Sequence, residues 1–176
     1  MIFRLNGKIL EGQNYSDIML QMKERDFELP ETVLEYKQNV VRRANLKDQS
    51  LVLLKDKKFI QKLEKADLIS ELYRFYFYGS LRYKQGNHYL VSCYEHYREK
   101  DCTVPQYQKV LLNGTCFFGA VPNVNDSIEC ESYLISKHAL DALDSLEGHP
   151  TVYKRFLVPN NVGKLGFLYV YAGLLR

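Results

Sequence analysis

The chain has 176 residues, of which 46% are hydrophobic and 26% are charged. These fractions are close to the average for globular proteins, and they exclude a disordered or fibrous chain. The 24 basic and 21 acidic residues leave a net charge of +3, which is too small for a strong non-specific hold on a phosphate backbone, so we expect no nucleic-acid partner.

The N-terminal residues give no sign of a targeting or membrane segment. The first apolar run ends at the turn dipeptide Asn6-Gly7, and charged residues follow before any stretch long enough for a signal peptide or a bilayer span. We therefore expect a cytoplasmic protein with no membrane partner.

The four cysteines predict free thiols. Cys93, Cys102, Cys116 and Cys130 form no Cys-x-x-Cys pair, and nothing else in the sequence indicates an oxidising compartment. The nearest approach to metal-ligand spacing is Cys93 with His96, which lacks a second matched pair. We therefore expect no metal site.

Residues 1–71 predict a small α+β extension that opens with a hairpin. Asn6-Gly7 lies between short apolar runs and is typical of a type I′ turn, so a β-hairpin is expected over residues 1–10. Ser16 is a favourable N-cap for a short helix over residues 17–22, where apolar residues recur at helical spacing.

Two further helices and a brief strand complete the predicted extension. One helix is expected to begin at Pro30, a residue favoured in a first helical turn. A brief buried strand is expected over residues 51–54, followed by a helix over residues 56–66.

The character of the sequence changes at Tyr73. From there on aromatic and β-branched residues are dense, glycines recur at short intervals, and strand signals dominate. We place a domain boundary near Glu71, which gives the N-terminal extension over residues 1–71 and a second domain over residues 72–176.

The first chemically notable segment is a strand that ends in a glycine turn. Phe75-Tyr76-Phe77-Tyr78 predicts a buried strand, and Gly79-Ser80-Leu81 follows it directly. Consecutive backbone N–H groups at such a turn can bind a carboxylate or a developing oxyanion. Taken alone, a strand followed by Gly-Ser is more often a simple turn.

The second notable segment is a short helix with a glutamate at its end. Ser136 is a favourable N-cap, and Gly148 and Pro150 end the helix. Its apolar stripe consists of Ala139, Leu140, Leu143 and Leu146. Glu147 therefore lies at the C-terminus, where the helix dipole raises the pKa of a carboxylate toward a value useful for proton transfer. The alternative is a solvated glutamate, as at most helix ends.

Taken together and in order, these motifs resemble one known group of enzymes. The matching residues are Tyr78-Gly79-Ser80-Leu81, then Gln85, Asn87 and His88, then Leu143 to Gly148, and finally Tyr153 and Arg155. They resemble the gamma-glutamylcyclotransferase-like superfamily, and most closely the gamma-glutamylamine cyclotransferases. The resemblance runs from about Arg74 to Tyr171.

The resemblance implies an α+β fold, namely a small mixed β-barrel with flanking helices. It implies that a gamma-glutamyl compound binds in a cleft between the Tyr78–Leu81 loop and the helix end, and that Glu147 moves the proton as 5-oxoproline forms. The substrate-binding residues would be Tyr78, Gly79, Ser80, Leu81 and Tyr153. No cofactor is expected, and neither a Gly-x-Gly-x-x-Gly nor a Walker-type motif occurs.

Several of these residues also have structural interpretations. For Tyr78 a structural role at the strand end is favoured over direct substrate contact. Tyr153 and Arg155 are expected to alternate on one strand. Arg155 is expected to pair with an acidic residue, and Tyr153 either has a structural role or faces the cleft. Asn87 and His88 are expected to orient the loop, and for His88 a structural role is favoured over catalysis.

The sequence departs from the family pattern in two places. Tyr83-Lys84 occupies a stretch where relatives have a glycine, which leaves the loop shape open. Residues 94–108 do not align with the family, and we expect them to be an insertion that lines the leaving-group side of the cleft.

Two alternative functions remain open at this point. The pocket could belong to a binding module that holds a small metabolite without turning it over, with the N-terminal extension contacting an unknown protein partner. Basic residues of the extension could also contact an acidic partner, although a solvated face is favoured because acidic neighbours dilute them. These residues are Lys37, Arg42, Arg43, Lys55, Lys57 and Lys58.

Overall fold

The computed structural model describes residues 1–5, 7–14, 17–18, 20–21, 57–65, 67 and 69–174. By its contacts the chain divides into two compact units, Met1–Leu72 and Tyr73–Arg176. The helix predicted to begin at Pro30, the strand predicted over residues 51–54 and most of the basic residues considered for a protein partner lie outside the described residues.

The first unit opens with the predicted hairpin. Strand β1 (Ile2–Leu5) pairs antiparallel with β2 (Lys8–Glu11), and Leu5 lies opposite Lys8. Only two residues therefore form the turn, and Gly7 has a φ of +76°, which glycine adopts without steric cost. The Asn-Gly dipeptide between two short apolar runs thus predicted the hairpin correctly.

Helical structure in the first unit also follows the prediction. Helix α4 (Lys57–Lys65) lies within the range expected for the third helix, and its Leu63 is buried. The described residues between 17 and 21 are helical as well. In the described part of the chain no helix is both long and apolar enough to cross a bilayer.

The second unit is a mixed sheet organised around one long strand. Its elements in chain order are β3 (Ile69–Phe77, which starts in the first unit), α5 (His88–Ser92), β4 (His96–Arg98), β5 (Cys102–Leu111), β6 (Phe118–Ser136), η1 (Lys137–Ala139), α6 (Leu140–Glu147), β7 (Tyr153–Pro159), β8 (Leu165–Tyr171) and η2 (Ala172–Leu174). β4 and β5 pair antiparallel with β6, and β7 pairs antiparallel with β8.

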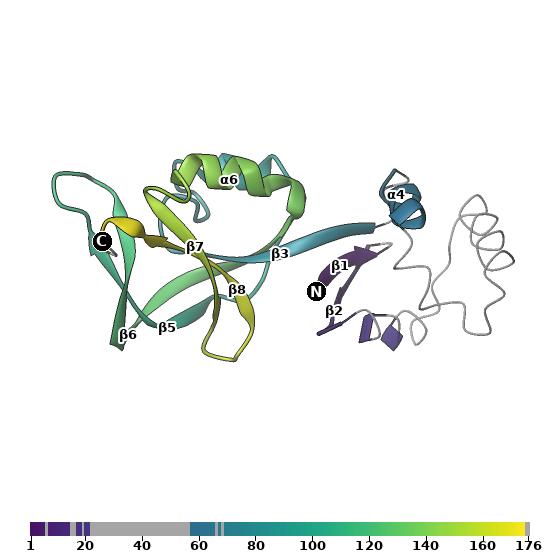
Figure 1. Cartoon of the computed structure of the whole chain (residues 1–176), viewed down its shortest axis with the longest axis horizontal. Coiled ribbons are helices and arrows are strands. Elements are labelled where there is room, and N and C mark those ends of the chain that lie inside the picture. The colour runs from purple at the N-terminus through teal and green to yellow at the C-terminus, as the bar shows by residue number, and fades with distance from the viewer. Residues whose placement is uncertain are drawn as a thin grey trace, which may run out of the picture. The chain divides into compact units, whose positions relative to one another are not determined.

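Parallel pairings curl this sheet. β8 pairs parallel with both β3 and β6, through Phe75–Phe167 and Ala120–Val170, while β3 is itself a neighbour of β6. These three strands therefore close on one another, and α6 covers one face of the curl (Figure 1). The result is the predicted α+β fold with few helices.

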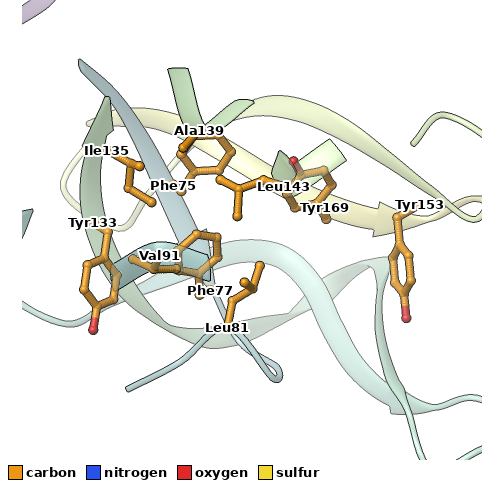
Figure 2. Packing of buried hydrophobic residues seen from close by; sticks show 10 residues of the cluster. All are labelled: Phe75, Phe77, Leu81, Val91, Tyr133, Ile135, Ala139, Leu143, Tyr153 and Tyr169. Atoms are coloured by element: carbon orange, nitrogen blue, oxygen red, sulfur yellow. The ribbon is translucent and has the colours of Figure 1, made fainter. Parts of the chain in front are cut away.

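The hydrophobic core fills the space between α6 and the curled sheet. Phe75 and Phe77 on β3 are almost fully buried, with ring centroids 5.7 Å apart, and they form one cluster with Val91, Ala139 and Leu143 (Figure 2). The run of aromatic residues thus forms the expected buried strand, although β3 begins at Ile69, earlier than the aromatic residues alone indicated. This packing fixes the ends of β3 and α6, where the candidate site residues lie.

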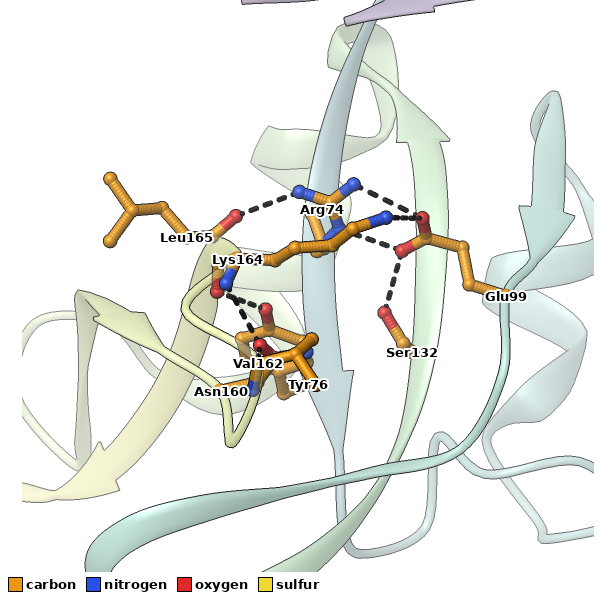
Figure 3. Close-up of polar contacts among 8 residues, drawn as sticks. All are labelled: Arg74, Tyr76, Glu99, Ser132, Asn160, Val162, Lys164 and Leu165. Carbon is orange, nitrogen blue, oxygen red and sulfur yellow. Dashed lines mark hydrogen bonds and ion pairs between the residues drawn. The ribbon is translucent and has the colours of Figure 1, made fainter.

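A buried ion pair ties the start of the second unit together. Arg74 is 3% exposed and donates two hydrogen bonds to Glu99, of 2.7 and 3.0 Å (Figure 3). Ser132 Oγ donates a third to Glu99, and Arg74 Nη1 also donates to the carbonyl of Leu165. Burial opposes ionisation of Glu99, but the hydrogen bonds from Arg74 and Ser132 lower its pKa. The pair therefore stays charged and holds β3 against β6 and β8.

The four cysteines are free, as predicted. Cys93 and Cys116 are exposed, Cys102 is half-buried and Cys130 is buried. Burial raises the pKa of the Cys130 thiol, so this cysteine behaves as a small apolar core residue.

Candidate active site

A pocket of about 710 Å³ opens in the second unit. Its walls come from the end of β3 with the following loop, from the turn between β5 and β6, and from the end of α6 with the start of β7. All residues proposed from the sequence for catalysis or substrate binding line it, namely Tyr78, Gly79, Ser80, Leu81, Glu147 and Tyr153. The fold therefore brings two motifs that are far apart in the sequence to one cavity.

The loop after β3 presents unpaired main-chain donors to this pocket. Within the described part of the chain, the backbone N–H groups of Gly79, Ser80 and Leu81 have no hydrogen-bond acceptor. A Cβ atom added at Gly79 would have no neighbour within 4 Å. Open space beside consecutive N–H groups is what an anion or a developing oxyanion requires.

Asn87 and His88 hold this loop in shape, as the sequence predicted. Asn87 Nδ2 donates to Ser80 Oγ at 2.8 Å, and its backbone N–H donates to the Ser80 carbonyl at 3.0 Å. His88 Nδ1 lies 2.9 Å from the carbonyl oxygen of Leu81. These contacts use the Ser80 hydroxyl and the carbonyl groups of the loop. The N–H groups of the loop are therefore left free to bind a ligand.

Glu131 is a further support of the loop that the sequence did not reveal. Its side chain is 7% exposed, and its carboxylate accepts a hydrogen bond of 2.7 Å from the Tyr83 backbone N–H. Arg82 and Arg98 lie 3.6 and 3.4 Å from the same carboxylate. This contact accounts for the loop shape at Tyr83, where the family pattern has a glycine. A single glutamate in a strand carries no spacing signal that would have identified it.

Tyr78 has the structural role that the sequence favoured. Its hydroxyl donates to the Tyr169 carbonyl at 2.7 Å and accepts from the Ala120 backbone N–H at 3.0 Å. These two bonds tie the end of β3 to β8 and β6, and burial raises the pKa of the Tyr78 hydroxyl. Tyr78 therefore lines the pocket with its hydroxyl group uncharged and hydrogen-bonded as both donor and acceptor.

Glu147 is the last residue of α6 and lines the same pocket. Ser136 Oγ accepts from the His138 N–H at the start of the preceding η1 turn, and Gly148 ends α6 with a left-handed φ of +61°. Within the described residues, the Glu147 carboxylate has no hydrogen-bond or ion-pair partner. Burial raises the pKa of Glu147 to about 7. The sequence attributed such a rise to the helix dipole, whereas burial is the cause in the structure.

One helical turn earlier, Asp144 anchors the same helix end. Arg155 Nη1 donates to both carboxylate oxygens of Asp144, at 2.7 and 2.8 Å, and the Tyr169 hydroxyl donates at 2.6 Å. Asp144 is thus the acidic partner that was expected for Arg155. The contribution of Tyr169 was missed, because nothing in its sequence spacing marks it.

Tyr153 faces the pocket from β7. Its hydroxyl donates to the Phe118 carbonyl at 2.9 Å, and its ring packs edge-on against Tyr171 with centroids 5.8 Å apart. Burial, together with the nearby charge of Glu147, raises the pKa of Tyr153 to about 12. Tyr153 therefore lies close enough to Glu147 to sense its charge and stays protonated at neutral pH.

The expectation for residues 94–108 was wrong. This segment forms β4 and most of β5, both paired with β6, and none of its residues lines the pocket. The pocket wall instead begins at Lys109 and continues through the turn between β5 and β6.

The assembled arrangement suits one type of chemistry. A carboxylate with a pKa near neutrality can both accept and donate a proton at neutral pH. In the same pocket, the unpaired N–H groups of Gly79–Leu81 can hold an anionic group or stabilise a developing oxyanion.

Comparisons with known proteins agree on the family. A family model described as "Gamma-glutamyl cyclotransferase, AIG2-like" matches residues 75–175. The "Gamma-glutamylcyclotransferase family protein YtfP" of Escherichia coli K12 is 34% identical over 99 residues, which cover 56% of this chain and 81% of the relative. The protein of the same description from Shigella flexneri matches with the same identity and coverage.

A solved structure shows the same fold. An AIG2-like protein from Mus musculus matches with a TM-score of 0.51 and 22% sequence identity. The match covers 58% of this chain and 78% of the mouse chain. This likeness confirms the predicted α+β fold of the barrel type, in which the mixed sheet curls into a half-barrel with few helices.

Proposed function

The chain belongs to the gamma-glutamyl cyclotransferase, AIG2-like family, and on this basis we propose that it is an amide-cleaving cyclotransferase. Its substrate is a gamma-glutamyl amine or peptide, and its products are 5-oxoproline and a free amine. We place the reaction in the cytoplasm, where its four free thiols are stable.

One observation carries this proposal. Glu147, with its pKa raised to about 7 by burial, lines the same pocket as the loop of unpaired N–H groups at Gly79–Leu81. The nucleophile of this reaction is the α-amine of the substrate itself. The protein therefore has to supply only a group that transfers a proton and N–H donors that stabilise the developing negative charge.

The reaction proceeds by ring closure within the substrate. The Glu147 carboxylate accepts a proton from the α-ammonium group, and the resulting α-amine attacks the γ-carbonyl carbon. The carbonyl oxygen becomes negative and is stabilised by backbone N–H groups of Gly79–Leu81. The ring nitrogen now carries one proton in excess. When the carbonyl re-forms, the bond to the leaving nitrogen breaks, and Glu147 gives that nitrogen the proton it took from the α-ammonium group. Glu147 then accepts the excess proton from the ring nitrogen and passes it to the released amine, which leaves as an ammonium ion. The new lactam bond replaces the amide bond, and no water is consumed.

The alternative of a binding module without turnover is less well supported. A pocket that only held a carboxylate-bearing metabolite would gain nothing from Glu147, because a buried anion repels such a ligand and is costly to ionise. The same residue is useful only if a proton is transferred.

The experiment that tests this proposal is a product assay on a substrate panel. The protein is incubated with gamma-glutamyl amines, gamma-glutamyl dipeptides and glutathione, and 5-oxoproline is measured. We expect 5-oxoproline together with an equal amount of free amine from at least one class. Binding of these compounds without product would favour the binding module instead.

A further inference from the structure

A lysine on the pocket wall is not used by the proposed reaction. Lys109 lies on β5, opposite Ala120 on β6, and lines the pocket. Its ammonium group lies 4.3 Å from the centroid of the Phe118 ring, a distance at which a cation is attracted to the face of an aromatic ring. The ring thereby fixes a positive charge beside the cavity.

This charge differs from the other cation in the pocket wall. Arg82 also lines the pocket, but its guanidinium lies 3.6 Å from the Glu131 carboxylate, which partly neutralises it. No carboxylate in the described part of the chain pairs with Lys109. Lys109 is therefore the cation available to an anionic group of a ligand.

The contacts of Phe118 connect Lys109 to the proposed catalytic residue. The Tyr153 hydroxyl donates to the Phe118 carbonyl at 2.9 Å, and Tyr153 lies near enough to Glu147 to sense its charge. Tyr153, Phe118 and Lys109 are thus linked by direct contacts, and Glu147 lines the same pocket as these three residues. A substrate whose scissile amide lies at Glu147 would extend along Tyr153 and Phe118 toward Lys109.

The turn that completes this wall is well defined. The Leu112 N–H donates to the Phe117 carbonyl at 2.9 Å, Thr115 Oγ1 donates to the Leu112 carbonyl at 2.9 Å, and the Phe117 N–H donates to Thr115 Oγ1 at 3.1 Å. Phe117 and Phe118 nevertheless remain 61% and 45% exposed. They offer apolar surface to a ligand next to the Lys109 ammonium group.

From this arrangement we propose that Lys109 determines substrate specificity by binding a carboxylate on the leaving amine. The inference rests on the proposed cyclotransferase function and refines it. The preferred substrates are then gamma-glutamyl α-amino acids with an apolar side chain, which lies against Phe117 and Phe118. Gamma-glutamyl amines that lack the carboxylate are poorer substrates.

The test compares two substrates that differ only in that carboxylate, γ-glutamyl-phenylalanine and γ-glutamyl-phenethylamine. We expect the wild-type protein to have about a five- to tenfold higher kcat/KM for the phenylalanine compound, since a charge-assisted contact at an exposed lysine is partly screened by water. In Lys109→Met the ratio of the two kcat/KM values should fall to about one, because kcat/KM decreases for γ-glutamyl-phenylalanine and stays unchanged for γ-glutamyl-phenethylamine. Lys109→Arg should keep the preference.

Lys154→Met is the matched control, because Lys154 is an exposed lysine that does not itself line the pocket. This variant should keep the wild-type ratio. Equal kcat/KM values for the two substrates in the wild-type protein would overturn the proposal. So would an equal loss with both substrates in Lys109→Met, which would assign Lys109 to the glutamyl carboxylate that both compounds share.

Calorimetric titration separates this inference from the proposed function. Both compounds are titrated into Glu147→Gln and into Glu147→Gln/Lys109→Met, neither of which should turn them over. A preference for γ-glutamyl-phenylalanine that disappears with Lys109 supports the subsite even if no 5-oxoproline is ever found. Equal affinities in the presence of Lys109 contradict it, whatever the product assay shows.

Discussion

Asp144 on α6 and Arg155 on β7 form an ion pair in which one guanidinium nitrogen lies 2.7 and 2.8 Å from the two carboxylate oxygens. The pair is half-buried and accepts a further hydrogen bond from Tyr169. Because Asp144 precedes Glu147 by one helical turn, this contact fixes the direction in which the helix end delivers Glu147 to the pocket. Arg155 and Tyr169 on the sheet thus position Glu147, the residue proposed to transfer the proton.

Asp144→Asn should weaken both stability and activity. The substitution keeps the side-chain shape but removes the charge that Arg155 faces, so we expect a loss of about 1–3 kcal/mol in the free energy of unfolding. We also expect kcat to fall more than KM rises, since Glu147 shifts while the Gly79–Leu81 loop does not. Urea unfolding and steady-state kinetics measure the two effects.

Asp101→Asn is the control for that experiment. Asp101 pairs with Arg98 at 3.1 Å, but its side chain is 61% exposed, and such pairs contribute little. We expect its stability to stay within about 0.5 kcal/mol of the wild-type value. If both asparagine variants behaved alike, the Asp144–Arg155 pair would have no special role.

Two glycine-to-alanine substitutions should have opposite effects. At Gly148 the φ of +61° strains an alanine, and the added Cβ would lie 2.9 Å from Val152 Cγ2, so Gly148→Ala should cost about 1–2 kcal/mol of stability. At Gly79 the added Cβ meets no atom within 4 Å, so Gly79→Ala should unfold like the wild-type protein or slightly later.

Activity separates these two variants further. Gly79→Ala should lose about tenfold or more in kcat/KM, because its methyl group occupies space beside the N–H groups proposed to bind the substrate. Thermal unfolding and kinetics on the same preparations provide the comparison. Full activity in a stable Gly79→Ala protein would remove the loop from the proposed mechanism.

Local sequence patterns predicted those parts of the protein that local chemistry determines. Asn6-Gly7 specified the hairpin turn, and Ser136 with Gly148 delimited the helical segment that ends at Glu147. Long-range contacts were not predictable in this way. The Glu131 contact with Tyr83 joins β6 to a loop, and the Tyr169 contact with Asp144 joins β8 to α6. Both depend on the register in which β6 and β8 lie in the sheet.

The role of residues 94–108 was predicted wrongly for a related reason. β5 shows no regular alternation of buried and exposed residues, and it contains Pro105, next to which its register with β6 shifts. The strand is defined by its pairing with β6 and not by an alternating pattern of its own. A sequence pattern that is set by a partner strand cannot be recognised before the partner is known.

Glu147→Gln should stabilise the protein at high pH. The pKa of Glu147 rises from 4.5 to about 7 on folding, so the native state holds a proton that the unfolded state has released. This group therefore contributes less stability as pH rises from about 4.5 to 7. We expect the variant to match the wild type near pH 4.5 and to exceed it by up to about 3 kcal/mol at pH 8.

Comparison of the two proteins by urea unfolding at several pH values isolates this one group, because all other titrating residues are shared. A constant difference in unfolding free energy from pH 4.5 to pH 8 would mean that Glu147 is exposed to solvent in solution and titrates normally.

The most direct measurement of the central claim is release of 5-oxoproline from a gamma-glutamyl substrate by the wild-type protein and by Glu147→Gln at the same pH. We predict turnover by the wild type, with kcat/KM rising through about pH 7 as the carboxylate ionises. We predict a loss of about 100-fold or more in Glu147→Gln, with the circular dichroism spectrum and calorimetric substrate affinity retained. Undiminished turnover by a correctly folded Glu147→Gln protein would show that another group moves the proton.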